Sequence, residues 1–166
     1  MRVVLVPGVL ALLPEYAGLD DPVAELRAAC LEAVRWLGDG PVILADPQGE
    51  RVARALVDAA GVSTSSTTGD RSTTGASAYL VIGNGSAKRT EKAPGHLDER
   101  AHPFDEGLGA SLRAGRPEVD AALAEQLWAS VEGIGRMAEL GELGEARVDY
   151  DDDPYGVQYW VMRWER

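Results

Sequence analysis

Short apolar runs alternate with segments of helical period through the first half of the chain, and this alternation constrains the fold most. Three runs rich in β-branched residues lie at 3–6, 42–45 and 79–82. Such short, continuous apolar runs are typical of central strands that are covered on both faces. Residues 22–37 and 50–60 instead space their apolar side chains three and four positions apart, as one face of a helix does. The alternation predicts an α/β fold with a largely parallel central sheet and helices on both faces.

Capping residues mark the ends of the two predicted helices. Asp21 and Pro22 have the order of an N-cap and a first helical residue, and Gly38 follows the last apolar position. Gly61 ends the second helix in the same way. Cys30 lies on the apolar face of the first helix, so we expect a buried, unreactive thiol.

The second half of the chain predicts further helices and two strands. Residues 104–114 form one predicted helix, and 117–140 form one or two more. Strands are expected at 147–150 and 155–164, the second with alternating apolar positions. The four tryptophans, Trp36, Trp128, Trp160 and Trp164, are expected in the core or at an interface. The inward side of the 117–140 segment is predicted to carry Leu123, Leu127, Trp128, Val131 and Ile134.

Length, charge and the N-terminal sequence limit the class of protein. The 166 residues fit a single domain over 1–166. The formal net charge of −11 argues against nucleic acid or an anionic membrane as the main partner, because both require a basic surface. Pro7 and Gly8 interrupt the N-terminal apolar stretch, which predicts a strand and a turn rather than a signal peptide. We therefore expect a cytoplasmic protein, with homo-oligomerisation left open.

A polar segment separates the second predicted helix from the third strand. Residues 63–78 contain ten Ser or Thr residues. Such a segment buries too little apolar surface to pack as a core element, which predicts a mobile surface loop.

The turn after the third predicted strand is the strongest candidate for a ligand site. Ligands of open α/β sheets bind beyond the carboxyl ends of the strands. Glycines there allow a ligand to approach the backbone, and cationic side chains donate to a carboxylate or phosphate. The candidate ligand-binding residues are Gly83, Asn84, Gly85, Ser86, Lys88 and Arg89. The alternative is that carboxylates at Asp98, Glu99 or Asp105 neutralise these cations on the surface.

Three side chains near this turn are weak catalytic candidates. Ser86 follows a glycine-rich turn as a nucleophilic serine does, but Lys88 breaks the Gly-x-Ser-x-Gly pattern. His96 and His102 are the only histidines. Their spacing across a loop fixes no metal geometry, so no metal site is expected.

The stretch GNGSAKRTEKAPGHLDERAHPFD, residues 83–105, resembles the signature of the class III extradiol ring-cleavage dioxygenase family (LigB-type fold), closest to its actinobacterial subunit-B-like branch. The closing DDDPYGVQYWVMRW and the first strand with its following helix are similar to the family's two ends. The resemblance implies a class III extradiol dioxygenase-like α/β domain. Active members of this family open aromatic diols with Fe(II) and dioxygen. Their iron is held by two histidines and a glutamate, and a further histidine acts as acid and base.

The chain departs from that family pattern at each strand end. Residues 7–14 contain no histidine, and Asp46 stands where the second metal histidine is expected. Ala87 occupies the place of the acid/base histidine. Alanine neither transfers a proton nor binds a metal, so we expect no cofactor and no iron-dependent ring cleavage.

Three functional hypotheses follow from these residues. The first is a dioxygenase-like protein that binds a small, anionic molecule at the strand edge without catalysis. The second is a divergent metal-dependent oxidoreductase that uses His96 or His102. The third is a non-enzymatic interaction or assembly protein, which an exposed apolar patch around the tryptophans would favour.

Overall fold

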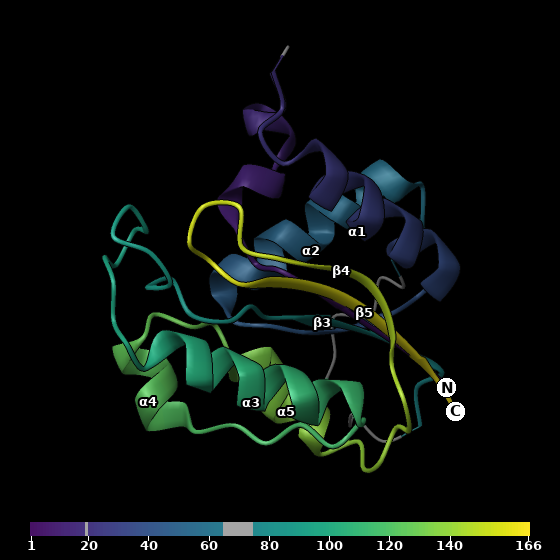
Figure 1. Cartoon of the computed structure of the whole chain (residues 1–166). Helices are drawn as coiled ribbons and strands as arrows, with labels where there is room; N and C mark the ends of the chain where they lie inside the picture. The colour runs from purple at the N-terminus through teal and green to yellow at the C-terminus, as the bar shows by residue number, and fades with distance from the viewer. Residues whose placement is uncertain (19, 65–74) are drawn as a thin grey trace.

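The computed structural model describes residues 1–18, 20–64 and 75–166, whose strands form one five-stranded sheet between two layers of helices (Figure 1). The strand order is β2-β3-β1-β5-β4. The strands are β1 (Arg2–Val6), β2 (Val42–Leu44), β3 (Ala78–Ile82), β4 (Arg147–Asp152) and β5 (Tyr159–Glu165).

The sheet is mixed, because β5 runs in the opposite direction to the other four strands. β3 pairs in parallel with both β1 and β2, whereas β5 runs antiparallel to β1 and to β4. The connection from β4 to β5 is too short for a crossover, so these two strands have to run in opposite directions. The prediction of an α/β fold is confirmed, and the parallel arrangement is confined to the half of the sheet that holds β1, β2 and β3.

The helices lie on both faces of the sheet, as predicted. α1 and α2 cover one face, and α3, α4 and α5 lie on the other side (Figure 1). Their bounds are α1 (Ala24–Leu37), α2 (Pro47–Ala60), α3 (Ala101–Arg113), α4 (Ala121–Gln126) and α5 (Glu132–Ala138). Two 3₁₀ turns, η1 (Leu10–Leu12) and η2 (Pro14–Tyr16), connect β1 to α1.

β1 shows why the sheet has a core on each side. Val4 and Val6 pack with the α1 and α2 layer, whereas Val3 and Leu5 pack with α3 and α5. Successive side chains of a strand point to opposite faces, so an entirely apolar strand requires both faces to be covered. Cys30 lies in the α1 layer, and burial raises the pKa of its thiol, as expected for an unreactive cysteine.

Both helix starts differ from the predicted positions for local reasons. α1 begins at Ala24, two residues after the predicted start, and the Asp21 carboxylate before it accepts from Val23 N and from Arg27 Nε of the first turn. α2 begins at Pro47, three residues before the predicted 50, because the Asp46 carboxylate caps it by accepting from Gly49 N at 2.6 Å.

The segment predicted as one or two helices over 117–140 consists of α4 and α5. The prediction that Trp128 lies on the inward side of this segment is wrong. Trp128 follows α4, and its backbone φ of 58° is left-handed. The whole residue is 58% exposed to solvent. Ile134 and Leu127 are buried, as predicted, and so are Trp160 and Trp164.

Two expectations concern segments outside this packing. Most of the predicted mobile loop at 63–78 falls on residues 65–74, which lie outside the described part of the chain. Among the described helices, none has both the length and the apolar composition needed to cross a membrane.

Candidate functional site

The carboxyl ends of β1, β2 and β3 meet at one edge, where the sequence predicted a ligand site. Packing within the protein fills much of this edge. A Cβ atom on Gly8 would lie 2.8 Å from Ile82 Cγ2, and one on Gly83 would lie 2.8 Å from the carbonyl oxygen of Ser130. Glycine is needed here because other parts of the chain approach closely.

Asp46 follows β2, and both of its carboxylate oxygens accept hydrogen bonds from the protein itself. Its Oδ1 caps α2, and its Oδ2 accepts from the Ser130 hydroxyl at 3.2 Å. The position where the family resemblance implies a metal histidine is therefore occupied by a helix cap.

The turn after β3 is held by backbone hydrogen bonds to two distant segments. Asn84 and Ser130 exchange N–H···O bonds of 3.0 and 3.1 Å, and Gly85 N donates to Gln158 O at 2.9 Å. Ala87 N donates to Leu127 O, and Ala87 itself is buried. The turn is thus a structural junction in which backbone groups face other backbone groups.

Asp105 of α3 is the centre of a buried polar cluster beneath this turn. Its Oδ1 accepts from Ser86 N at 2.8 Å, and its Oδ2 accepts from Ser86 Oγ at 2.6 Å and from Arg89 Nη1 at 2.8 Å. Ser86 is 0% exposed and Asp105 is 3% exposed. A buried serine hydroxyl that donates to a carboxylate has no access to a substrate, so the nucleophile interpretation of Ser86 gains no support.

Arg89 bridges this cluster to the turn between β4 and β5. Its Nε donates to Asp153 Oδ2 at 2.7 Å, in addition to the bond from Nη1 to Asp105. Burial lowers the pKa of the Arg89 guanidinium, but the two carboxylates outweigh burial and raise it. The geometry matches the alternative in which Asp105 neutralises this cation, and a ligand-binding role for Arg89 stays a prediction.

The Lys88 side chain does not join the Asp105 cluster and contacts an aromatic ring instead. Its ammonium lies 5.4 Å from the centre of the Trp128 ring, which is cation–π distance. Among the described residues, Lys88 forms no ion pair, and its charge is a minor contribution to the lowered pKa of Asp98. We call these two side chains the Lys88–Trp128 platform. The exposed Leu97 belongs to the loop that follows Lys88, where Asp98 N donates to Lys88 O at 3.0 Å.

No pattern in the sequence indicated that Trp128 is exposed. It occupies the position after the end of α4 where glycine is the usual residue, because the backbone there is left-handed. A bulky side chain in this conformation is strained, and strain of this kind concentrates at functional sites.

His96 and His102 lie on the exposed loop and at the start of α3, not at the strand ends. Each ring contacts a backbone carbonyl at 3.3 Å, His96 with Glu91 O and His102 with Arg89 O. No group of three or more His, Cys, Asp or Glu side chains within the described ranges is arranged to hold a metal ion.

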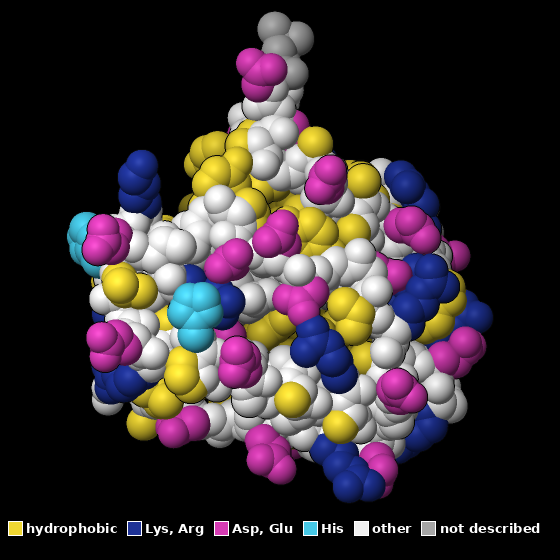
Figure 2. Space-filling view, viewed as in Figure 1, with side chains coloured by type: hydrophobic (Ala, Val, Ile, Leu, Met, Phe, Trp, Pro, Cys, Tyr) yellow, Lys and Arg dark blue, Asp and Glu magenta, His cyan; other side chains and the backbone are white. Residues whose placement is uncertain are grey.

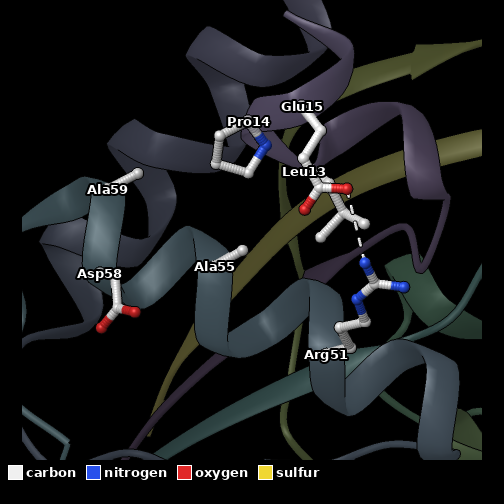
Figure 3. Close-up of a pocket in the computed structure, with 7 residues that line it drawn as sticks. All are labelled: Leu13, Pro14, Glu15, Arg51, Ala55, Asp58 and Ala59. Carbon is white, nitrogen blue, oxygen red and sulfur yellow. Dashed lines mark hydrogen bonds and ion pairs between the residues drawn. The ribbon is translucent and has the colours of Figure 1, made fainter.

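A groove of about 550 Å³ lies between η2 and α2 (Figure 3). Leu13, Pro14, Ala55 and Ala59 form its apolar surface, and Arg51 reaches Glu15 across it at 3.5 Å. None of the predicted ligand-binding residues lines it.

No protein-family model, curated protein or solved structure matches this chain.

Proposed function

We propose that the chain is a non-catalytic binding protein of the class III extradiol dioxygenase fold, and that it binds a small anion at the Lys88–Trp128 platform. One observation supports the proposed binding of an anion. Lys88 has an ammonium without an ion pair among the described residues, whereas its neighbours Arg89 and Arg100 are each paired with carboxylates.

The donor set at the strand ends argues for the loss of iron chemistry. Gly8 offers no side chain, Asp46 is engaged as a helix cap, and the buried Ala87 stands in place of a proton donor. These residues do not fit the two-histidine, one-carboxylate arrangement that holds Fe(II) in ring-cleaving enzymes. No oxidative step is therefore assigned to this chain.

The platform suits an aromatic carboxylate. The ammonium keeps hydrogen-bond donors for a carboxylate, and the exposed indole offers a flat apolar surface beside them. Trp128 tolerates an unfavourable backbone conformation while its ring stays accessible, which is expected where the ring has a role in binding.

Benzoate and inorganic phosphate are the probes for this site. We expect saturable quenching of Trp128 fluorescence by benzoate, and a loss of about 10- to 150-fold in affinity for Lys88→Ala, the range for a charged hydrogen bond. Lys92→Ala is the matched control, because Lys92 is an exposed lysine of the same loop. Equal affinity of the Lys88→Ala protein and the wild type, or no saturable binding of either anion, would refute the anion site.

Oxygen uptake tests the other half of the proposal. With protocatechuate or catechol and added Fe(II), we expect no protein-dependent uptake. A ring-opened yellow product that forms in proportion to protein concentration would overturn the assignment as non-catalytic.

A second candidate is an interaction or assembly protein. The specific observation in its favour is that two large apolar residues are exposed: Trp128 of the platform is 58% exposed, and Leu97, next to the Asp98 whose backbone bonds to Lys88, is 49% exposed.

A further inference from the structure

We propose that the groove along α3 docks a cationic amphipathic helix of a partner protein. This groove, of about 420 Å³, has an apolar floor of Pro103, Phe104, Leu108 and Val119, and an acidic rim of Glu118 and Asp120. We call it the α3 groove. The inference does not depend on the anion site, with which it shares no residue.

The charges around the α3 groove favour a cation. Three arginines belong to α3 or flank it, and each is already paired with a carboxylate outside the groove: Arg100 with Asp98, Arg113 with Asp151, and Arg116 with Glu142. Glu118 has no side-chain hydrogen bond or ion pair among the described residues. The rim therefore keeps its negative charge.

The surface around the groove carries many acidic side chains. Figure 2 shows them spread over the part of the molecule formed by α3 and the chain that leads to α4, with hydrophobic side chains and some Lys or Arg side chains between them. With a net charge of −11, the whole protein attracts cationic partners over distance and repels acidic ones.

The floor of the groove permits the close approach of a helix. Gly107 lines the groove in the interior of α3, and a Cβ atom built on it would meet no atom within 4 Å. This bare position leaves room for the side chain of a partner between Phe104 and Leu108. A helix with apolar residues at positions i, i+3, i+4 and i+7 presents a stripe that fits such a groove, and lysines beside the stripe reach the acidic rim.

Synthetic helical peptides test the proposal with the intact protein. The first carries a leucine stripe and lysines on the other positions, the second has the same stripe with glutamates, and the third has lysines without the stripe. We expect saturable binding of the first in fluorescence anisotropy, weakening with added salt, and at least about tenfold weaker binding of the other two.

Two variants locate the binding. Gly107→Leu fills the groove and should weaken binding of the first peptide, the lysine–leucine peptide, at least about tenfold. The control is Gly135→Leu in α5, since a Cβ atom at Gly135 also meets nothing within 4 Å. Glu118→Lys should weaken binding of the same peptide about two- to fivefold by reversing the charge of the rim. Its control is Glu139→Lys, since Glu139 is an exposed glutamate at the end of α5 that does not line the α3 groove.

Several outcomes would overturn the proposal. Equal losses of peptide affinity in the two leucine variants would show that the peptide binds outside the α3 groove. Equal binding of the glutamate peptide would show that the charge of the rim does not select the partner. No saturable binding of the lysine–leucine peptide would refute the groove as a helix site. A dimer in sedimentation that Gly107→Leu disrupts would assign the groove to a second copy of this chain.

Discussion

Asp105 ties together three segments that are far apart in the sequence. It sits in α3, accepts from both the backbone and the hydroxyl of Ser86, and pairs with Arg89, which in turn holds Asp153. The close approach of Asp105 also requires glycine at position 85, since a Cβ atom on Gly85 would lie 2.5 Å from Asp105 Oδ1. A buried carboxylate is stable in this position because each oxygen accepts hydrogen bonds and a guanidinium balances its charge.

Replacing Asp105 by Asn tests this role. The amide would direct N–H groups at some of the present donors and leave Arg89 with Asp153 as its remaining carboxylate. We expect a loss of about 1–3 kcal/mol in the free energy of unfolding, measured by urea denaturation, because buried donors lose their acceptor. Asp98→Asn is the control, because Asp98 pairs with Arg100 on the surface, and its effect should be much smaller. Similar losses in the two variants would show that Asp105 is not the anchor of the turn.

α5 is a short helix whose position depends on one glycine. Gly133, in its first turn, faces the carbonyl oxygens of Leu44 and Ile82, so a Cβ atom would overlap the ends of β2 and β3. This approach lets Ile134 and Met137 fill the core beneath the sheet. The same helix contains Gly135, which faces outward and meets no neighbour.

The two glycines of α5 should therefore respond to alanine with opposite signs. Gly133→Ala forces α5 away from the sheet and should cost about 3 kcal/mol, as overpacking does. Gly135→Ala should stabilise the protein by about 0.5–1 kcal/mol, because alanine loses less conformational freedom in a helix than glycine does. Urea unfolding of both variants checks this. Stabilisation by Gly133→Ala would mean that α5 does not pack this closely on the strand ends.

At the scale of the whole molecule, local patterns predicted the elements better than their meeting points. The runs at 3–6 and 79–82 became the central strands β1 and β3, because continuous apolar sequence has to be covered on both faces. The run at 42–45 became β2, which lies at the edge of the sheet and is only partly buried. The antiparallel direction of β5 was not predicted, since alternation within one strand says nothing about its neighbour's direction.

The candidate site depended on contacts that no local pattern encodes. The sequence predicted a turn after the third strand, which the structure has after β3, but it did not show that Ser130 and Gln158 would pair with that turn. The Arg89–Asp153 ion pair spans 64 residues. The helical spacing over 117–140 placed Trp128 on the inward side, while a left-handed backbone holds it at the surface.

The stability of the folded molecule should fall at both ends of the pH range. On the acid side, hydrogen bonds from Arg100 hold the pKa of Asp98 down to about 2, and the side-chain bond from Arg27 lowers the pKa of Asp21. The unfolded carboxylates take up protons near pH 4 while the folded ones stay ionised, so stability is lost as the pH falls from about 5 toward 2.

On the alkaline side, Tyr159 dominates the expected loss. Burial raises the pKa of its phenol from 10.0 to about 12, because the packed interior disfavours the phenolate. Between these values the unfolded chain releases the proton and the folded protein keeps it, so stability decreases as the pH rises from 10 to 12, on the order of 2–3 kcal/mol. Tyr159→Phe should behave like the wild type at pH 7 and lose less stability by pH 11 in chemical denaturation. Tyr16→Phe removes an exposed phenol and should leave the alkaline loss unchanged. If Tyr159→Phe and the wild type lost stability in parallel above pH 10, the Tyr159 phenol would not be buried as the fold requires.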